Sequence, residues 1–261
     1  MGVNIFVPCL MYHSLSKEAE KNIYTVLLND FRTQMEFLTS QGYRAITVVD
    51  YLKINHQSDV PGKYVLITFD DGTESDYDLA LPILKKINYK ATFFIIAGRI
   101  GQPGRLSWEQ LNEMKSAGMS IESHTFSHRV LSHLSPEEIH HELSESKKIL
   151  EDRLEMEVSH LSLPMGVAND AVKGVARQIG YKAIWTSRFG INRVGDDLLS
   201  LRRIVVRRGI KLASFKNYLS PNLIIFQKEF FAEPLVGSFK KILGIDRYGR
   251  IKKLLFDRDI R

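Results

Sequence analysis

The sequence has few of the features that mark disulfide-stapled, secreted or membrane-spanning proteins. Its 261 residues include one cysteine, Cys9, so no internal disulfide can form, and we interpret Cys9 as a small buried apolar residue. No apolar run reaches the roughly 18 residues that a membrane span needs. The first residues carry no basic leader, so we expect no cleavable signal peptide and a cytoplasmic protein.

Positive and negative charges nearly balance over most of the chain, and a basic excess lies at its end. The net charge is +6, but residues 207–261 alone hold thirteen Lys/Arg against five Asp/Glu. This basic segment, which also contains many aromatic residues, allows three interpretations: packing on the main domain, contact with an anionic membrane surface, or nucleic-acid binding. No recognisable nucleic-acid motif is present, so we expect no nucleic-acid partner.

Short apolar runs alternate with amphipathic segments along the first 208 residues. The runs are mostly continuous, which is typical of parallel strands that are buried on both faces. The predicted strands are Val7–Tyr12, Arg44–Val48, Tyr64–Phe69, Ala91–Ile96, Ser120–Ser123, His160–Leu163, Lys182–Thr186 and Leu201–Val206. The predicted helices are Phe31–Gln41, Asp78–Lys86, Ser107–Ala117, Ser135–Leu154 and Asn169–Ile179.

The repeated strand–helix order predicts an α/β fold, and seven or eight such units predict a barrel. We expect residues 1–208 to form this barrel and residues 209–261 to form a basic appendage. Ser107 and Ser135 are expected to cap the helices that they open.

Two short motifs at strand ends point to a hydrolytic metal site. Asp70 and Asp71 follow one apolar run, and His124 and His128 follow another. One carboxylate and two imidazoles make a three-ligand site for a divalent metal with room for water, and the second carboxylate can act as a base. Taken alone, each motif could equally be a capping pair or a polar loop, but together they favour metal-assisted hydrolysis.

These motifs resemble the first two motifs of the polysaccharide deacetylases, the NodB-like group or carbohydrate esterase family 4. The matching segments are Thr68–Gly72 and His124–His128, and the likeness extends from Leu10 to about Val206. The resemblance implies a distorted (β/α) barrel of about seven strands that removes N-acetyl groups from an amino sugar. It implies that Asp70 is the general base. The metal ligands that it implies are Asp71, His124 and His128.

Other parts of the family's pattern differ in this sequence. Ser162 stands where the family has an arginine that orients the base, and the usual aspartate–tryptophan motif is reduced to Trp185. The turn after Ser162 can still present the Met165 N–H to a developing oxyanion. The late Leu-x-x-His motif that supplies the general acid is missing.

A histidine near the start of the chain offers a replacement for that acid. The segment Leu10–His13 resembles the circularly permuted poly-N-acetylglucosamine deacetylases, in which an N-terminal histidine sits in the site. The resemblance implies that His13 is the general acid, although a histidine packed under a loop is the alternative. The histidines in or beside predicted helical segments are expected to face solvent; they are His133, His140, His141 and His160.

The leading hypothesis is a metal-dependent N-deacetylase acting on an N-acetylhexosamine-containing glycan or sugar conjugate, in exopolysaccharide or cell-envelope biosynthesis. Zn²⁺ is the favoured metal, and Ni²⁺, Co²⁺ and Mn²⁺ also suit an Asp-His-His site. The alternatives are a related hydrolase of other C–N amide bonds and a catalytically weak carbohydrate-binding barrel. Contact of the basic segment with the inner face of the membrane would suit a lipid-linked substrate.

Overall fold

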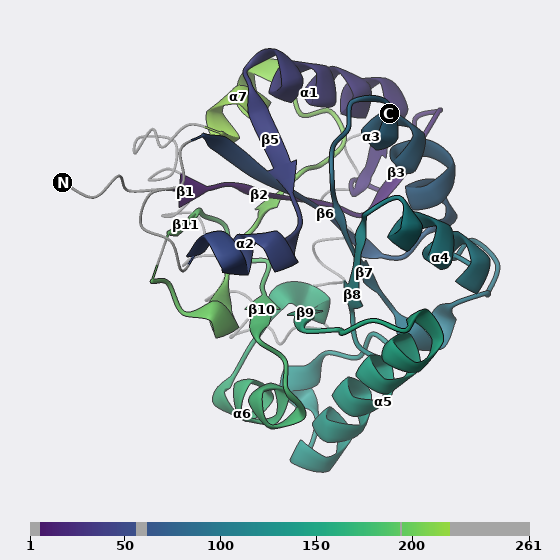
Figure 1. Cartoon of the computed structure of the whole chain (residues 1–261), viewed down its shortest axis with the longest axis vertical. Coiled ribbons are helices and arrows are strands. Elements are labelled where there is room, and N and C mark those ends of the chain that lie inside the picture. Colours follow the sequence, from purple (N-terminus) through teal and green to yellow (C-terminus); the bar gives the residue numbers. More distant parts are fainter. Residues whose placement is uncertain (1–5, 56–61, 194, 220–261) are drawn as a thin grey trace.

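A curved sheet of eight parallel strands forms the centre of the molecule (Figure 1). The computed structural model describes residues 6–55, 62–193 and 195–219. Seven strands follow the order β10-β9-β8-β7-β6-β2-β12, and β5 pairs with the first half of β6. Their bounds are β2 (Cys9–Tyr12), β5 (Tyr43–Ile46), β6 (Lys63–Asp71), β7 (Thr92–Ile95), β8 (Ser120–Ser123), β9 (His160–Ser162), β10 (Ala183–Trp185) and β12 (Ile204–Val205).

All eight predicted strands are present, and the predicted α/β barrel is confirmed in distorted form. The two edges of the sheet approach each other through one isolated parallel bridge, between Trp185 of β10 and Leu201 just before β12. The sheet therefore closes only partly. Because all strands run parallel, their carboxyl ends meet at one rim, which is where barrel enzymes place reactive groups.

Most of the helices cover the outside of the sheet, whereas α2 (Val48–Asn55) packs on its concave side (Figure 1). The others are α1 (Leu28–Ser40), α3 (Leu81–Lys86), α4 (Trp108–Ser116), α5 (Pro136–Leu154), α6 (Asp170–Ile179) and α7 (Leu212–Tyr218). A π-helical turn, Asp76–Ala80, precedes α3. The predicted caps are confirmed, because Ser107 and Ser135 each form a capping box with the residue three positions on.

Several short elements were not predicted from the sequence. Val48 begins α2 rather than ending a strand. Two pairs of very short strands lie outside the main sheet. They are β1 (Phe6–Val7) with β11 (Asn192–Arg193), and β3 (Ser14–Ser16) with β4 (Thr25–Leu27). Segments of two or three residues are too short for their periodicity to be visible in a sequence.

The buried apolar residues form two layers, one on each face of the sheet. The larger layer lies between the strands and the surrounding helices. The smaller one fills the concave side, where Trp185 packs edge-on against Tyr51 of α2 at a centroid distance of 5.8 Å. Cys9 is fully buried in this inner layer, which agrees with its interpretation as a small apolar residue. This inner layer packs beneath the residues at the rim.

The described part of the expected appendage begins with a helix that packs on the barrel. In α7, Phe215 is fully buried and meets Phe37 of α1 edge-on. The Tyr43 hydroxyl donates to the Leu219 carbonyl at 3.0 Å. Residues 220–261, with most of the basic and aromatic residues singled out in the sequence, lie outside the described residues.

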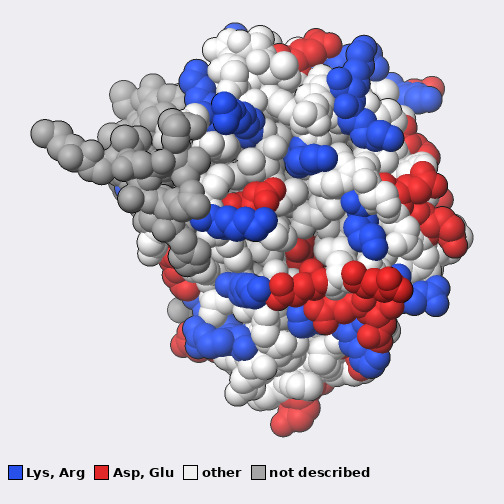
Figure 2. Space-filling model, viewed as in Figure 1, with Lys and Arg blue, Asp and Glu red and all other residues white. Residues whose placement is uncertain are grey.

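Figure 2 shows Lys and Arg interspersed with Asp and Glu on the face that it presents. This agrees with the near-neutral charge of the chain before its basic end. Among the described helices, none combines the length and apolar character that crossing a membrane requires.

Candidate metal centre and active site

The two acidic residues that end β6 point in different directions. Asp70 is 3% exposed and lies against buried side chains of the barrel interior. Asp71 has a φ of 82° and turns toward the histidines of the β8–α5 loop. Gly72 also has a positive φ, and a Cβ there would lie 3.0 Å from Ile95 Cδ1. The backbone thus separates two adjacent carboxylates into two environments, at a cost in strain that is typical of functional sites.

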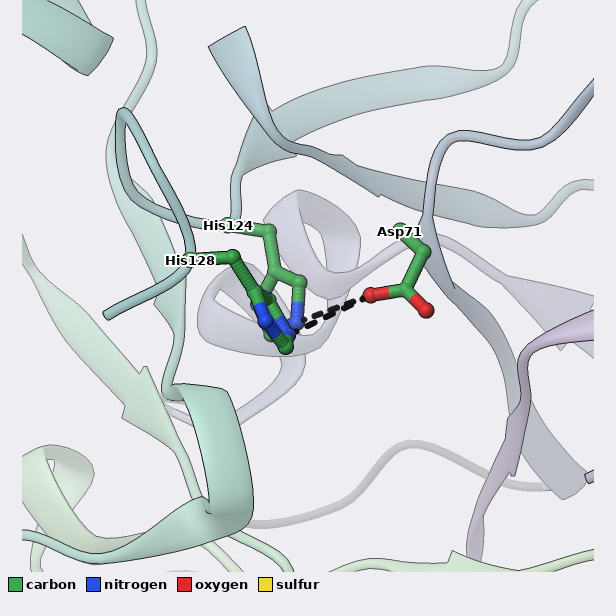
Figure 3. Close-up of side chains that lie close together, drawn as sticks. All are labelled: Asp71, His124 and His128. Atoms are coloured by element: carbon green, nitrogen blue, oxygen red, sulfur yellow. Dashed lines mark ion pairs between the residues drawn. The ribbon is translucent and has the colours of Figure 1, made fainter. Parts of the chain in front are cut away.

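The predicted metal ligands lie together at the rim (Figure 3). The Asp71 Oδ1 atom is 3.5 Å from His124 Nε2 and 3.4 Å from His128 Nε2. One ligand atom from each residue falls within 4.8 Å of the others. Asp71 Oδ1 is buried and receives no hydrogen bond from the described residues. A carboxylate and two imidazoles around a buried oxygen without a donor fit a divalent cation.

The hydrogen bond made by the other ring nitrogen of His124 supports this fit. His124 Nδ1 lies 2.8 Å from the Ser162 carbonyl, which can only accept, so Nδ1 carries the proton. The Nε2 atom of the neutral ring is then left with its lone pair facing Asp71. Backbone carbonyls orient metal-binding histidines in this way in many metalloproteins.

The electrostatics of the three residues also favour a cation among them. Burial alone would raise the pKa of Asp71, but the imidazoles of His124, His13 and His128 hold it well below its usual range. Burial alone would lower the pKa of His124, but Asp70 and Asp71 raise it above its ordinary value. Burial and the neighbouring His124 lower the pKa of His128 to about 4. The cluster therefore stabilises one positive charge and opposes a second.

Although Ser162 stands where the family has an arginine, another arginine holds Asp70. Arg203 is fully buried and binds both carboxylate oxygens of Asp70, with Nη1–Oδ1 at 2.7 Å and Nη2–Oδ2 at 2.8 Å. Ser162 Oγ donates to the same Oδ2 at 3.0 Å and accepts from Arg203 Nη2 at 2.8 Å. The serine that replaces the family's arginine is therefore part of the arrangement that holds the carboxylate.

These contacts keep Asp70 ionised in a buried place. Burial alone would raise its pKa, but the Arg203 guanidinium and the nearby His124 bring it below the ordinary value. Two parallel N–H donors also fix the plane of the carboxylate. Asp70 is thus an ionised carboxylate of fixed orientation beside the predicted metal ligands.

Arg203 reaches Asp70 from beneath the rim. It immediately precedes β12, in which Ile204 pairs with Leu10, so its backbone lies well below the end of β6. Its Nε donates to the Thr186 carbonyl at 3.0 Å, and its guanidinium lies 5.5 Å from the centre of the Phe94 ring. Arg203 lies within the predicted strand Leu201–Val206, and its contact with Asp70 was not predicted. The signal that could have indicated this contact was a positively charged residue inside a predicted apolar strand.

His13 follows β2 and lies beside the same site. Its ring stacks at a tilt on Tyr24, with the centroids 4.7 Å apart, and its Nδ1 atom is buried without a hydrogen-bond partner among the described residues. Burial lowers the pKa of His13, while Asp70 and Asp71 act in the opposite direction. The imidazole is therefore within electrostatic reach of both rim carboxylates.

Met165 lies in the turn that follows β9, at the same rim. Its φ is 59°, and it is 37% exposed, the one large apolar side chain that is exposed among the described residues. The next residue, Gly166, packs so tightly that a Cβ there would lie 2.2 Å from the Ser187 nitrogen. This contact holds the turn in place.

The expectation that His160 faces solvent is wrong. Its side chain is fully buried in the barrel interior, where Nδ1 accepts a hydrogen bond from Trp185 Nε1 at 3.1 Å. Burial lowers its pKa to about 3, so the ring is neutral. His160 therefore lies in the barrel interior, next to Trp185 of the inner layer, rather than at the rim.

Known proteins resemble this chain both in sequence and in fold. The polysaccharide deacetylase family profile matches residues 57–184. The Bacillus subtilis protein YxkH, whose name assigns it provisionally to the polysaccharide deacetylases, is 35% identical over 82% of this chain and 76% of its own length. The poly-β-1,6-N-acetyl-D-glucosamine N-deacetylase of Staphylococcus aureus (strain MRSA252) is 30% identical over 66% of this chain, which spans 64% of that relative.

Two solved structures extend the likeness to the whole barrel. The deacetylase PplD of Streptococcus pyogenes, solved with acetate, superposes with a TM-score of 0.79 at 30% identity, covering 84% of this chain and all of that one. IcaB of Ammonifex degensii superposes with a TM-score of 0.72 at 26% identity, covering 84% and 97%. With its two motifs joined at one rim of this barrel, the chain belongs to the polysaccharide deacetylase family.

Proposed function

We propose that this protein is a metal-dependent hydrolase that removes N-acetyl groups from an N-acetylhexosamine-containing glycan. The observation that carries the proposal is the pairing of Asp70, held by Arg203, with the adjacent cluster of Asp71, His124 and His128. The names of the Staphylococcus and Streptococcus relatives support the reaction type. Exopolysaccharide or cell-envelope biosynthesis is the setting in which such an activity is expected.

Asp71, His124 and His128 would hold the metal, and Zn²⁺ is the ion that we favour. When bound, such an ion lowers the pKa of water and polarises an amide carbonyl. Asp70 is the base that takes the proton of the attacking water. Its fixed carboxylate plane and low pKa suit this role, because the group is ionised and oriented before the substrate arrives.

Two further groups complete the proposed chemistry. The Met165 backbone N–H donates to the oxyanion of the tetrahedral intermediate. His13 gives a proton to the departing amine. Its lowered pKa makes the imidazolium a stronger acid but a less populated one, so a step that depends on it slows as the pH rises. Replacement of His13 by Gln should remove this descending limb of kcat against pH, and an unchanged limb would assign the acid elsewhere.

The decisive experiment compares two adjacent carboxylates. Acetate release from N-acetylglucosamine oligomers is measured for the parent, Asp70→Asn and Asp71→Asn, together with the bound metal. We expect Asp70→Asn to lose about 100-fold or more in kcat while keeping its metal, and Asp71→Asn to lose the metal itself. The reverse pattern would exchange the two roles.

The same assay separates the alternatives. Hydrolysis of other amides in preference to acetylated sugars would favour a related C–N hydrolase. A protein that binds oligosaccharides but neither retains metal nor releases acetate would be a carbohydrate-binding barrel. Comparison of Zn²⁺ with Ni²⁺, Co²⁺ and Mn²⁺ in the metal-depleted protein identifies the active ion.

We further propose that the basic end of the chain brings the domain to the inner face of the membrane, where a lipid-linked sugar would be presented. Residues 220–261 contain nine Lys/Arg and five Asp/Glu, together with several phenylalanines. Co-sedimentation with anionic phospholipid vesicles tests this in the full chain, using a variant in which Lys240, Lys241, Lys252 and Lys253 are changed to Gln. Equal pelleting of both proteins would reject the membrane contact.

A further inference from the structure

The β8–α5 loop, residues 124–128, carries two of the three proposed metal ligands on an unusual backbone. Thr125 and His128 both have positive φ values, 65° and 68°. Residues other than glycine rarely adopt such angles, and they persist only where surrounding contacts determine them. The loop that presents His124 and His128 must therefore be held from outside.

One buried carboxylate on α5 makes three of the hydrogen bonds that hold this loop. Glu142 is 3% exposed, and its Oε2 accepts hydrogen bonds from the Phe126 N–H at 3.1 Å and the Ser127 N–H at 2.8 Å. The Ser127 hydroxyl donates to Oε1. The Phe126 N–H is shared with the Glu142 backbone carbonyl, so both donors of Ser127 depend on the carboxylate alone.

The position of Glu142 on its helix is unusual for a charged residue. It lies on the buried stripe of α5, together with Ile139, Leu143 and Leu150. Among the described residues no cation pairs with it, and its partners are the donors of the loop. Burying a carboxylate is costly unless hydrogen bonds satisfy it, so this residue ties the helix to the loop.

The remaining contacts hold the loop from the other side but do not replace this tie. The Ala97 N–H donates to the Thr125 carbonyl at 3.1 Å, and the Gly98 N–H donates to the Phe126 carbonyl at 2.8 Å. These bonds use the carbonyl groups of the loop. Of the N–H groups between the two histidines, those of Phe126 and Ser127 donate to Glu142 on α5, and that of Thr125 donates to Ser123 Oγ at 3.2 Å.

We propose that Glu142 is a positioning residue for the metal site: it fixes the loop so that the two imidazoles converge on Asp71. This inference rests on the proposed function, because it assumes that Asp71, His124 and His128 bind the metal. Groups that orient metal ligands typically contribute about 10- to 100-fold to metal affinity. We expect Glu142 to act in that range.

The test measures the affinity for Zn²⁺ by competition with a chromophoric chelator, and the ligand geometry by the absorption spectrum of the Co²⁺ form. The variants are Glu142→Ala, Glu142→Gln and the control Glu145→Ala, one turn along the same helix with no hydrogen bond to the loop. We expect Glu142→Ala to bind Zn²⁺ about 10- to 100-fold more weakly with an altered Co²⁺ spectrum. Glu145→Ala should match the parent.

Glu142→Gln separates the hydrogen bonds from a general effect of mutation. Its amide oxygen can accept both backbone N–H bonds, and its NH₂ can donate to the Ser127 hydroxyl, so we expect near-parental affinity and spectrum. A Gln variant as weak as the Ala variant would overturn the proposed tie. Thermal unfolding of the metal-free proteins shows whether each variant is folded.

Ser127→Ala tests the same contact from the loop side. It remains informative if Glu142→Ala does not fold. It removes one donor and should weaken Zn²⁺ binding by a smaller factor, whereas no change would count against the inference. Zn²⁺ binding by Glu142→Ala as tight as that of the parent would overturn the inference alone. Failure of the parent to bind Zn²⁺ would overturn the metal site itself.

Discussion

At the residue scale, Asp70 owes its chemistry to groups that compensate for its burial. A carboxylate removed from water tends to hold its proton. Three donated hydrogen bonds, two of them from Arg203 and one from Ser162, reverse that tendency. Removal of one partner would leave the other charge buried and unpaired. Losing one partner of this pair is therefore far more costly than losing one partner of an ion pair on the surface.

We predict that Arg203→Lys lowers kcat by about tenfold or more, because one charged hydrogen bond to Asp70 is lost and such a bond is worth about 1.5–3 kcal/mol. With less compensation the pKa of Asp70 rises toward its buried value, so the acid limb of kcat/KM against pH moves to higher pH. The pH profile of acetate release checks both effects. An acid limb that stays in place would show that Arg203 does not set the ionisation of Asp70.

At the element scale, the helices carry their own start signals, and these follow from the local sequence. The helix α5 begins with Ser135, whose side chain accepts from the Glu138 N–H while Glu138 accepts from the Ser135 N–H. The same reciprocal pair opens α4. Such boxes satisfy backbone donors that the helix itself leaves free.

We predict that Ser135→Ala lowers the free energy of unfolding by about 1 kcal/mol, the usual cost of losing such a cap. Chemical denaturation measures this change. Ser144→Ala, within the same helix and away from its ends, is the control and should change stability far less. Equal losses in the two variants would mean that the capping box adds nothing.

The β7–α4 turn offers a second prediction at this scale. A Cβ on Gly98 would lie 2.8 Å from the Phe126 carbonyl oxygen, closer than side chains pack. Gly98→Ala should therefore push the loop of residues 124–128 away and destabilise the fold by about 1–3 kcal/mol. Denaturation and Zn²⁺ titration would both register the displacement.

Gly174 in α6 provides the matched control for that substitution. A Cβ there meets no atom within 4 Å, so Gly174→Ala should stabilise the protein by up to about 1 kcal/mol through helix propensity. If Gly98→Ala proves equally harmless, then the turn does not support the metal loop.

At the scale of the whole molecule, the barrel interior contains titratable groups away from the rim. Burial raises the pKa of Glu122 to about 8, although the Ser159 and His160 N–H groups and the Ser120 hydroxyl donate to it. Burial lowers the pKa of His160 to about 3. The stability of the fold therefore depends on pH through its core as well as its surface.

Glu122 and His160 change the free energy of unfolding in opposite directions as the pH rises. Between its ordinary pKa of 4.5 and about 8, Glu122 keeps a proton in the folded state that the unfolded chain releases, so the free energy of unfolding falls as the pH rises. Between its ordinary value of 6.5 and about 3, His160 stays neutral in the folded state, so stability falls as the pH drops. Above pH 6.5, of these two residues, only Glu122 still makes the free energy of unfolding depend on pH.

We predict that Glu122→Gln flattens the decline in the free energy of unfolding between pH 6.5 and 8 that the parent shows. One proton accounts for at most about 1.4 kcal/mol per pH unit. Denaturant titrations across this range give the slope, and the parent-minus-variant difference cancels the other titrating groups. Parallel slopes would mean that Glu122 is ionised in the folded protein.

The features of this protein that depend on neighbouring residues could be predicted from the order of its amino acids. Continuous apolar runs predicted the eight main strands, because strands buried on both faces must be apolar on both. The cap residues Ser107 and Ser135 predicted the starts of two helices. The motifs around Asp71 and His124 predicted a metal cluster, because each motif ends a strand and parallel strands end at one rim.

The contacts that hold Asp70 and the loop of residues 124–128 form only in the folded chain and could not be predicted. Arg203 meets Asp70 across 133 residues, and Glu142 meets Ser127 from a neighbouring helix. In the sequence, the first is one of several arginines and the second one of many acids on a helix. Burial gives both residues their contacts, because an unpaired charge in the protein interior is too costly, so each binds the donors or acceptors that the fold brings to it.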